Sequence, residues 1–229
     1  MPILRDSFGL TYLSLMKYLI LLLILVGCGD DPPKQVEENY VPPTVEVNGE
    51  IFFARWGSLP VDLRIPDGFY DHYESELKGS VASIEEAFCQ SNTAPCVGTI
   101  INLIRDTSIN ELLSEYSACF YDNAILCSGQ NELAVIDDGE TPSGSLAFAT
   151  YYFGVFLIES DVVVDFNNDY TRFDLQSVLT HEFIHFLGIG HSASISDIMY
   201  PFFYPNQIKG LGAGDISDLR ATYPEKIIN

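Results

Sequence analysis

One eleven-residue segment constrains this chain more than any other. Residues 181–191 read His-Glu-Phe-Ile-His-Phe-Leu-Gly-Ile-Gly-His, and three of the four histidines in the chain lie within it. His181 and His185 are four residues apart, so a helix places both imidazoles on one face, where they can share one metal ion. Gly188 can adopt a positive φ and end that helix, which would bring His191 back toward the other two rings. The segment therefore predicts a helix, a sharp turn and a cluster of three imidazoles.

Such a cluster has a specific chemistry. Three neutral imidazoles and one water molecule make an open tetrahedral zinc site. Glu182 follows the first of these histidines and can reach a water molecule on the metal. We therefore expect one catalytic Zn²⁺ on His181, His185 and His191, with Glu182 as general base. The alternative is that three structural histidines share one element and that Glu182 is a surface charge, but the spacing argues against it.

The pattern H-E-x-x-H-x-x-G-x-x-H resembles the zinc-binding segment of metzincin metallopeptidases. Metzincins place a methionine turn beneath the metal, and residues 196–201, Ser-Asp-Ile-Met-Tyr-Pro, resemble the matrixin form of that turn. Ser192, directly after His191, is also similar to matrixins. The resemblance implies a zinc-dependent endopeptidase that cleaves proteins or peptides, in which Met199 supports the site without binding the metal. The open alternatives are a non-catalytic binding protein with this fold and a zinc enzyme that cleaves another kind of amide.

The resemblance to matrixins is strongest over residues 144–224. Residues 144–149 resemble the edge strand that pairs with extended substrate, and residues 161–166 resemble the strand after it. Matrixins commonly carry a second, structural zinc on histidines of those two strands. Here the corresponding residues are Phe148 and Val163, so we expect no second zinc. Two oxygen-rich turns can bind Ca²⁺, although solvated turns explain them equally well; they contain Asp137, Asp138 and Glu140, and Asp165, Asn167, Asn168 and Asp169.

Hydrophobic periodicity along the chain predicts an α+β fold. Strands are expected where short β-branched or alternating runs occur, and helices where apolar residues recur at helical spacing, with Asp174 as an N-cap. The resemblance implies a metzincin-type zincin fold, with a mixed twisted sheet, a long active-site helix and a small C-terminal subdomain that ends in a helix. The expected strands are 61–65, 99–104, 133–136, 146–153 and 155–164, and the expected helices are 70–88, 174–187 and 214–221.

The N-terminal segment has the features of an export signal. Residues 18–26 are apolar and follow Lys17, and a run of nine is too short for the roughly 20 residues of a spanning helix. Leu-Val-Gly-Cys at 25–28 resembles the bacterial lipobox, which implies a signal peptide over 1–27, a lipid on Cys28 and an extracytoplasmic place in the bacterial cell envelope. Translation could start at Met16. The alternative is an uncleaved anchor over residues 8–26.

The rest of the chain divides at about residue 50. Residues 28–49 are acidic and rich in proline, which predicts an extended tether, and residues 50–229 are expected to form the catalytic domain. The formal net charge of −21 disfavours nucleic acid as a partner. We expect protein or peptide substrates, a membrane reached through the lipid, and a monomer by assumption. Four cysteines allow three disulfide pairings, which stay open: Cys89, Cys96, Cys119 and Cys127.

Overall fold

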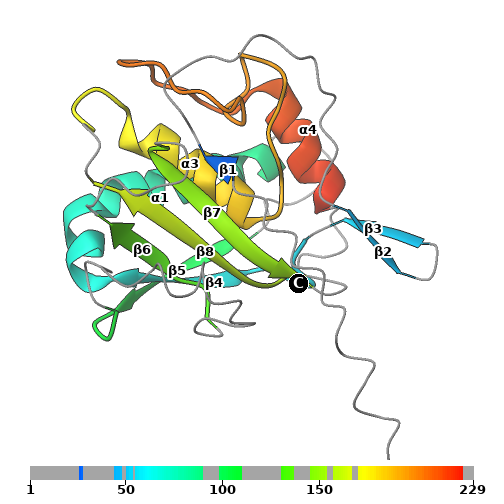
Figure 1. Cartoon of the computed structure of the whole chain (residues 1–229), viewed down its shortest axis with the longest axis horizontal. Coiled ribbons are helices and arrows are strands. Elements are labelled where there is room, and N and C mark those ends of the chain that lie inside the picture. The colour runs from blue at the N-terminus through cyan, green and yellow to red at the C-terminus, as the bar shows by residue number, and fades with distance from the viewer. Residues whose placement is uncertain are drawn as a thin grey trace, which may run out of the picture.

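The residues from Trp56 to Tyr223 share one hydrophobic core in a computed structural model of the chain, in which strands and helices lie in layers (Figure 1). Both residues are nearly inaccessible to solvent, so the two ends of this region are part of the same core. The structure describes residues 55–89, 98–109, 130–136, 145–153, 157–166 and 170–223, and the strand backbone of 26–27, 44–47 and 50–53.

The main sheet is mixed and has the strand order β1-β7-β8-β6. β6 runs parallel to β8, whereas β7 is antiparallel to both β8 and β1. β-branched and aromatic residues dominate β7 and β8, as is typical of buried strands. The expected α+β class with a mixed sheet is therefore confirmed. The bounds are β1 (Val26–Gly27), β6 (Leu133–Ile136), β7 (Ala147–Phe153) and β8 (Leu157–Asp165).

A second pair of parallel strands extends this sheet. β4 (Val61–Pro66) pairs with β5 (Ile101–Asp106) in parallel. An isolated parallel bridge joins Arg64 of β4 to Glu132, the residue just before β6, and the Arg64 N–H donates to the carbonyl of Asn131 at 2.9 Å. The strands are thus neighbours in the order β5-β4-β6-β8-β7.

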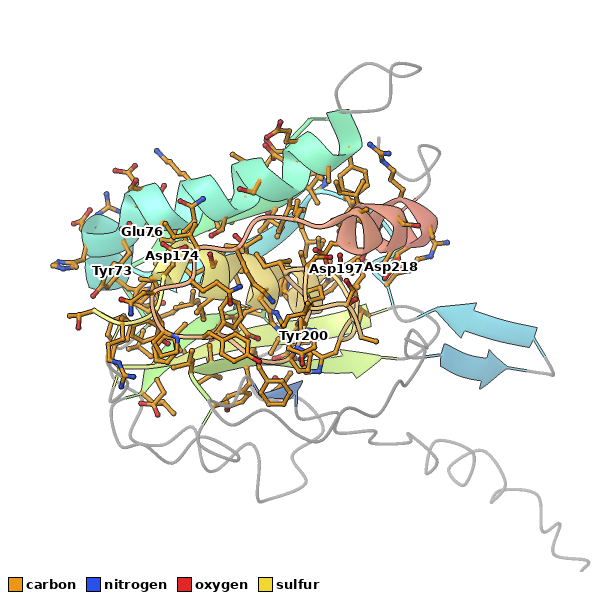
Figure 2. The ribbon with its side chains drawn as sticks, turned by 90° about the horizontal axis from the view of Figure 1, so that it is seen from above. Tyr73, Glu76, Asp174, Asp197, Tyr200 and Asp218 are labelled. Atoms are coloured by element: carbon orange, nitrogen blue, oxygen red, sulfur yellow. The ribbon has the colours of Figure 1, made fainter. Side chains whose placement is uncertain are left out.

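Two helices cover one face of the sheet. α1 (Asp67–Cys89) is the outer helix, and α3 (Leu175–Phe186) lies between it and the strands (Figure 2). The two helices approach closely because Gly79 has no side chain, and a Cβ there would collide with Gln176 of α3. Ser80 Oγ donates to the Gln176 carbonyl at 3.0 Å, which links the helices. α3 is therefore enclosed on both sides.

Alternate residues of β6, β7 and β8 point to opposite faces, as the pleat of a strand requires. One set faces the helices and joins the main core. The other set forms a separate apolar cluster of Ala134, Ile136, Phe148 and Val163. Phe148 and Val163 are direct partners across the β7–β8 ladder. The positions where matrixins carry structural-zinc histidines are thus occupied here by packed apolar side chains.

Most expected bounds lie within a few residues of the observed ones, and two departures have a local explanation. β2 (Thr44–Val47) and β3 (Glu50–Phe53) form an antiparallel hairpin, so the segment expected as an extended tether contains a strand. The dipeptide between the strands, Asn48-Gly49, is the preferred two-residue hairpin turn and was the signal for it. α4 (Ala213–Thr222) begins after Gly212, earlier than expected, because Asp215 accepts a hydrogen bond from the Gly212 N–H at 2.7 Å.

Among the described residues, no helix combines the length and the apolar character needed to cross a bilayer.

Candidate metal centre

α3 carries the first two histidines, and its start is fixed by its N-cap. Asp174 has extended backbone angles, and its carboxylate accepts from the Ser177 N–H at 2.8 Å and from Ser177 Oγ at 2.6 Å. The cap satisfies a backbone donor that has no partner within the helix. All but one of the twelve residues of α3 are buried, so its histidines project into protein and not into solvent. The expected helix and its expected cap are both confirmed.

The three histidines of the motif converge. One ring nitrogen from each of His181, His185 and His191 lies within 4.8 Å of the others, a separation that one ion can bridge. The ring centroids of His181 and His185 are 4.5 Å apart, and that of His191 lies 5.3 Å and 4.9 Å from them. The Nε2 atom of each ring is buried and has no hydrogen-bond partner in the described part of the chain. Three unsatisfied acceptors at one point indicate a cation between them.

Hydrogen bonds fix the tautomer of two of these rings. His181 Nδ1 lies 2.7 Å from the carbonyl oxygen of Ile198, and His185 Nδ1 lies 2.6 Å from that of Ile189. A carbonyl can only accept, so each Nδ1 must carry the proton and donate it. Each Nε2 then keeps its lone pair toward the centre of the cluster, which is the form that binds a metal.

The pKa values of the three imidazoles are depressed. Burial lowers the pKa of His185 to about 4, although its hydrogen bond to the Ile189 carbonyl has the opposite, smaller effect. Burial, followed by the nearby rings, also holds the pKa of His181 and that of His191 well below the usual 6.5. The cluster is therefore neutral at pH 7, as metal ligands must be.

Gly188 ends the helix and sets the path to the third histidine. Its φ of 88° lies in the left-handed region that favours glycine. Its N–H donates to the His185 carbonyl at 2.6 Å, and the Ile189 N–H donates to that of Ile184 at 3.2 Å. The sharp exit expected from the sequence is present, and it returns His191 to the other two rings.

The donor set suits zinc. Three imidazole nitrogens leave a fourth tetrahedral position open, and no thiol among the described residues joins the cluster. Glu182, beside the first histidine on α3, is fully buried. A buried carboxylate directly beside a cluster of candidate metal ligands favours a functional role.

Comparison with known proteins agrees with this geometry. The family model for Matrixin, the M10 peptidases, matches residues 128–224, which include β6 to α4 and all three histidines. This chain carries a matrixin-like domain. It is also similar to Metalloendoproteinase 1 of Glycine max, at 46% identity over 54 residues. That alignment covers 23% of this chain and 18% of the soybean protein.

Met199 of the matrixin-like domain is buried in the loop that follows the histidines. Its N–H and that of Ile198 donate to the two carboxylate oxygens of Asp215 on α4, at 3.2 and 2.7 Å. Burial raises the pKa of Asp215, and these hydrogen bonds oppose that rise. Because the Ile198 carbonyl also accepts from His181, Asp215 ties the loop and the first histidine to α4. The sequence alone did not single out Asp215 for this contact.

Two further residues that support the site were missed from the sequence. Trp56 Nε1 donates to the carbonyl of Phe186 at 2.8 Å, and the Tyr223 hydroxyl donates to that of Leu187 at 2.6 Å. These carbonyls lie at the C-terminal end of α3, where a helix has no further N–H groups to donate to them. Trp56 is 130 residues from Phe186 and Tyr223 is 36 residues from Leu187, so no local pattern pointed to their role.

Several sequence predictions lie outside the described residues. They include the lipid site at Cys28, the side chains of all four remaining cysteines and most of the two oxygen-rich turns. His72 is exposed on α1, where its ring contacts Tyr73, and it takes no part in the site.

Proposed function

We propose that this chain is a zinc-dependent endopeptidase in which His181, His185 and His191 bind the metal. The observation that carries the proposal is the convergence of three buried Nε2 atoms without partners, inside a region that matches the matrixin family model. The Glycine max relative, named Metalloendoproteinase 1, supports the same reaction class. Glu182 is the general base.

The metal and the side chains have separate roles in the proposed reaction. Bound zinc acidifies a water molecule and polarises the substrate carbonyl. Glu182 accepts the proton of the attacking water and delivers it to the leaving amine. The carbonyls of Ile198 and Ile189 keep two of the imidazoles in the metal-binding tautomer. Burial of α3 excludes bulk water from these hydrogen bonds, which strengthens them.

The direct test compares Glu182→Gln with the wild-type chain. Both proteins should retain about one zinc per chain, because Glu182 is not a ligand. The variant should lose about 10²–10⁴-fold in kcat on a peptide library, the range for a general base. His72→Ala removes the remaining histidine, which is exposed, and should behave as wild type. Wild-type protein that binds zinc but cleaves nothing in the library, or a fully active Glu182→Gln, would contradict the proposal.

The substrate is proposed to bind as an extended strand along the edge of β7 that faces away from β8. The pairing of β1 with that edge supports this, since Val26 and Gly27 lie opposite Ala149 and Phe148 in antiparallel register. An extended backbone therefore fits there. A chain that begins at residue 28 should show a lower KM than one that retains Val26 and Gly27. Equal KM values for the two chains would contradict this placement of the substrate.

We also propose that Cys28 carries a lipid and holds the enzyme at a bacterial envelope. Support comes from the sequence alone, in the short apolar run after Lys17 and the Leu-Val-Gly-Cys at its end. Removal of residues 1–27 at this cysteine would also remove β1 from the edge of β7. Lipidation and access of substrate would then be linked.

Metabolic labelling in a bacterial host tests the anchor. The chain from Met1 and the chain from Met16 should both incorporate an alkyne fatty acid and appear in the membrane fraction. Cys28→Ser should incorporate none. Label that persists in Cys28→Ser would contradict the assignment of the lipid to this residue.

A further inference from the structure

The loop from Ser192 to Tyr200, which we call the His191 loop, leads away from the third histidine. It is closed by hydrogen bonds between its own residues. The Ser192 N–H donates to the Met199 carbonyl at 2.8 Å, and the Tyr200 N–H donates to the Asp197 carbonyl at 3.2 Å. A buried carboxylate, that of Asp197, sits inside this closed loop.

Asp197 contacts the residue next to the third histidine. Ser192 Oγ donates to Asp197 Oδ2 at 2.6 Å, a short bond to a charged acceptor. Ser192 Oγ in turn accepts from the Ser194 N–H at 3.1 Å. The hydroxyl is therefore held on both sides, and with it the backbone that carries His191.

The other side of Asp197 meets the start of α4, as Figure 2 shows. The Gly214 N–H approaches Asp197 Oδ1 at 3.4 Å. Gly212 and Gly214 have no side chains, and a Cβ on either would collide with the Asp197 carboxylate. Lys209 Nζ also donates to the Asp197 carbonyl, at 2.9 Å. The carboxylate thus fits between the His191 loop and α4.

The contacts of Asp197 matter because the ring of His191 is held differently from those of the other two histidines. His181 and His185 are each held by a hydrogen bond from Nδ1 to a carbonyl. No such bond to the ring of His191 occurs within the described part of the chain. The direction of that ring then depends on its backbone, and the adjacent Ser192 is one point at which that backbone is fixed.

We propose that Asp197 is a positioning residue for the third metal ligand. It holds Ser192 against α4 and so presents His191 to the metal in the right direction. The proposal rests on the proposed function, since it takes His191 to be a zinc ligand. Partners of metal ligands are typically worth about 10–100-fold in metal affinity. Asp197 would supply this effect through the backbone and not through the ring.

The test measures zinc affinity of the full chain by competition with a chromogenic chelator, and the visible spectrum of the Co²⁺-substituted protein. Asp197→Ala should bind zinc about 10–100-fold more weakly and change the cobalt spectrum. Asp197→Asn keeps an oxygen that can accept from Ser192, and it should recover most of the affinity. Asp218→Asn is the matched control, because Asp218 lies near Asp197 on α4 (Figure 2) and should leave both readouts unchanged.

Ser192→Ala provides a second route that removes only a hydroxyl. It should weaken zinc binding by a factor similar to Asp197→Ala, and the double variant should lose little more than either single one, as expected for two residues that act through one contact. Gly214→Ala should displace the carboxylate and give the same cobalt spectrum as Asp197→Ala. If Asp197→Ala fails to fold, Ser192→Ala and Gly214→Ala still decide the matter.

The outcomes distinguish the role of Asp197 from the proposed zinc-dependent function on which it rests. Wild-type protein that binds no zinc would overturn the proposed function, and this inference with it. Wild-type protein that binds zinc, with Asp197→Ala and Ser192→Ala binding it equally well, would overturn the role of Asp197 alone. A loss in Asp218→Asn as large as that in Asp197→Ala would also overturn it, since the effect would then be one of charge.

Discussion

Two of the three imidazoles come from α3 and the third comes from the His191 loop, and these two regions are held in different ways. α3 is buried between α1 and the sheet, and both of its histidines have a hydrogen bond on the ring. The His191 loop is exposed at Ser194, Ile195 and Ser196. It is held by hydrogen bonds to two carboxylates, that of Asp197 within the loop and that of Asp215 on α4. The helix thus presents its ligand pair by packing and by hydrogen bonds on the rings themselves, whereas the loop presents the third ligand through polar contacts to its backbone.

The largest effect is expected on removal of the ligands themselves. His185→Ala and His191→Ala should both weaken zinc binding by more than the 10–100-fold typical of indirect contacts. His185→Ala should lose more, because it leaves one helix ligand and the loop ligand, whereas His191→Ala leaves the packed pair. Chelator competition measures both. A greater loss in His191→Ala would break the comparison between helix and loop.

Stability of the metal-free chain should depend on pH through the buried histidines. The pKa of His185 falls from 6.5 to about 4 on folding. Well above pH 6.5, His185 is unprotonated in both the folded and the unfolded state. As the pH falls through 6.5 toward 4, His185 binds a proton in the unfolded chain but stays neutral in the folded chain. Stability is therefore lost on acidification, by about 2 kcal/mol between pH 7 and pH 5 from this residue.

Urea unfolding in the presence of a chelator measures that dependence. His185→Gln removes this titration and should reduce the slope of the curve over the same interval, with the contributions of His181 and His191 remaining. A metal-free wild-type chain that is equally stable at pH 5 and pH 7 would contradict the depressed pKa values, and with them the burial of the ligand cluster.

The junction between the two regions is expected to show a smaller effect. Gly188 has a φ of 88°, and an alanine there would cost about 1–2 kcal/mol in a left-handed conformation. Gly188→Ala should lower the free energy of unfolding by that amount and also weaken zinc binding, since the turn directs the chain to His191. A Gly188→Ala variant that is less stable but binds zinc as tightly as the wild type would show that the turn is not needed to position the His191 loop.

The smallest effect is expected at the other end of α3. Asp174→Ala removes the N-cap and should cost about 1 kcal/mol in the free energy of unfolding. Zinc affinity of the folded variant should stay at the wild-type value, because the cap lies two turns from His181 and packing holds the helix. A variant that weakens zinc binding would show that α3 is less rigid than its burial indicates.

Much of the fold was predictable where the information is local. The helical stripe and Asp174 predicted α3, and alternation with β-branched residues predicted the strands from β4 to β8. The spacing of the histidines and Gly188 predicted that the three rings converge. These features depend on residues a few positions apart, where periodicity and capping act.

The supports of the site were not predictable in the same way. Trp56 and Phe186 are 130 residues apart, and the contact of Asp215 with Ile198 spans 17. Nothing in the sequence near Asp197 distinguishes a buried anchor from a solvated carboxylate of an acidic chain. The hairpin of β2 and β3 is different, because Asn48-Gly49 signalled it locally and the proline-rich composition around it obscured that signal.

X-ray absorption at the zinc edge tests the central claim most directly. Purified wild-type chain loaded with one zinc should show only nitrogen and oxygen neighbours at about 2.0–2.1 Å, with the outer-shell scattering of three imidazoles, and two imidazoles in His191→Ala. A sulfur neighbour at about 2.3 Å, or an unchanged imidazole count in His191→Ala, would contradict a centre built by His181, His185 and His191.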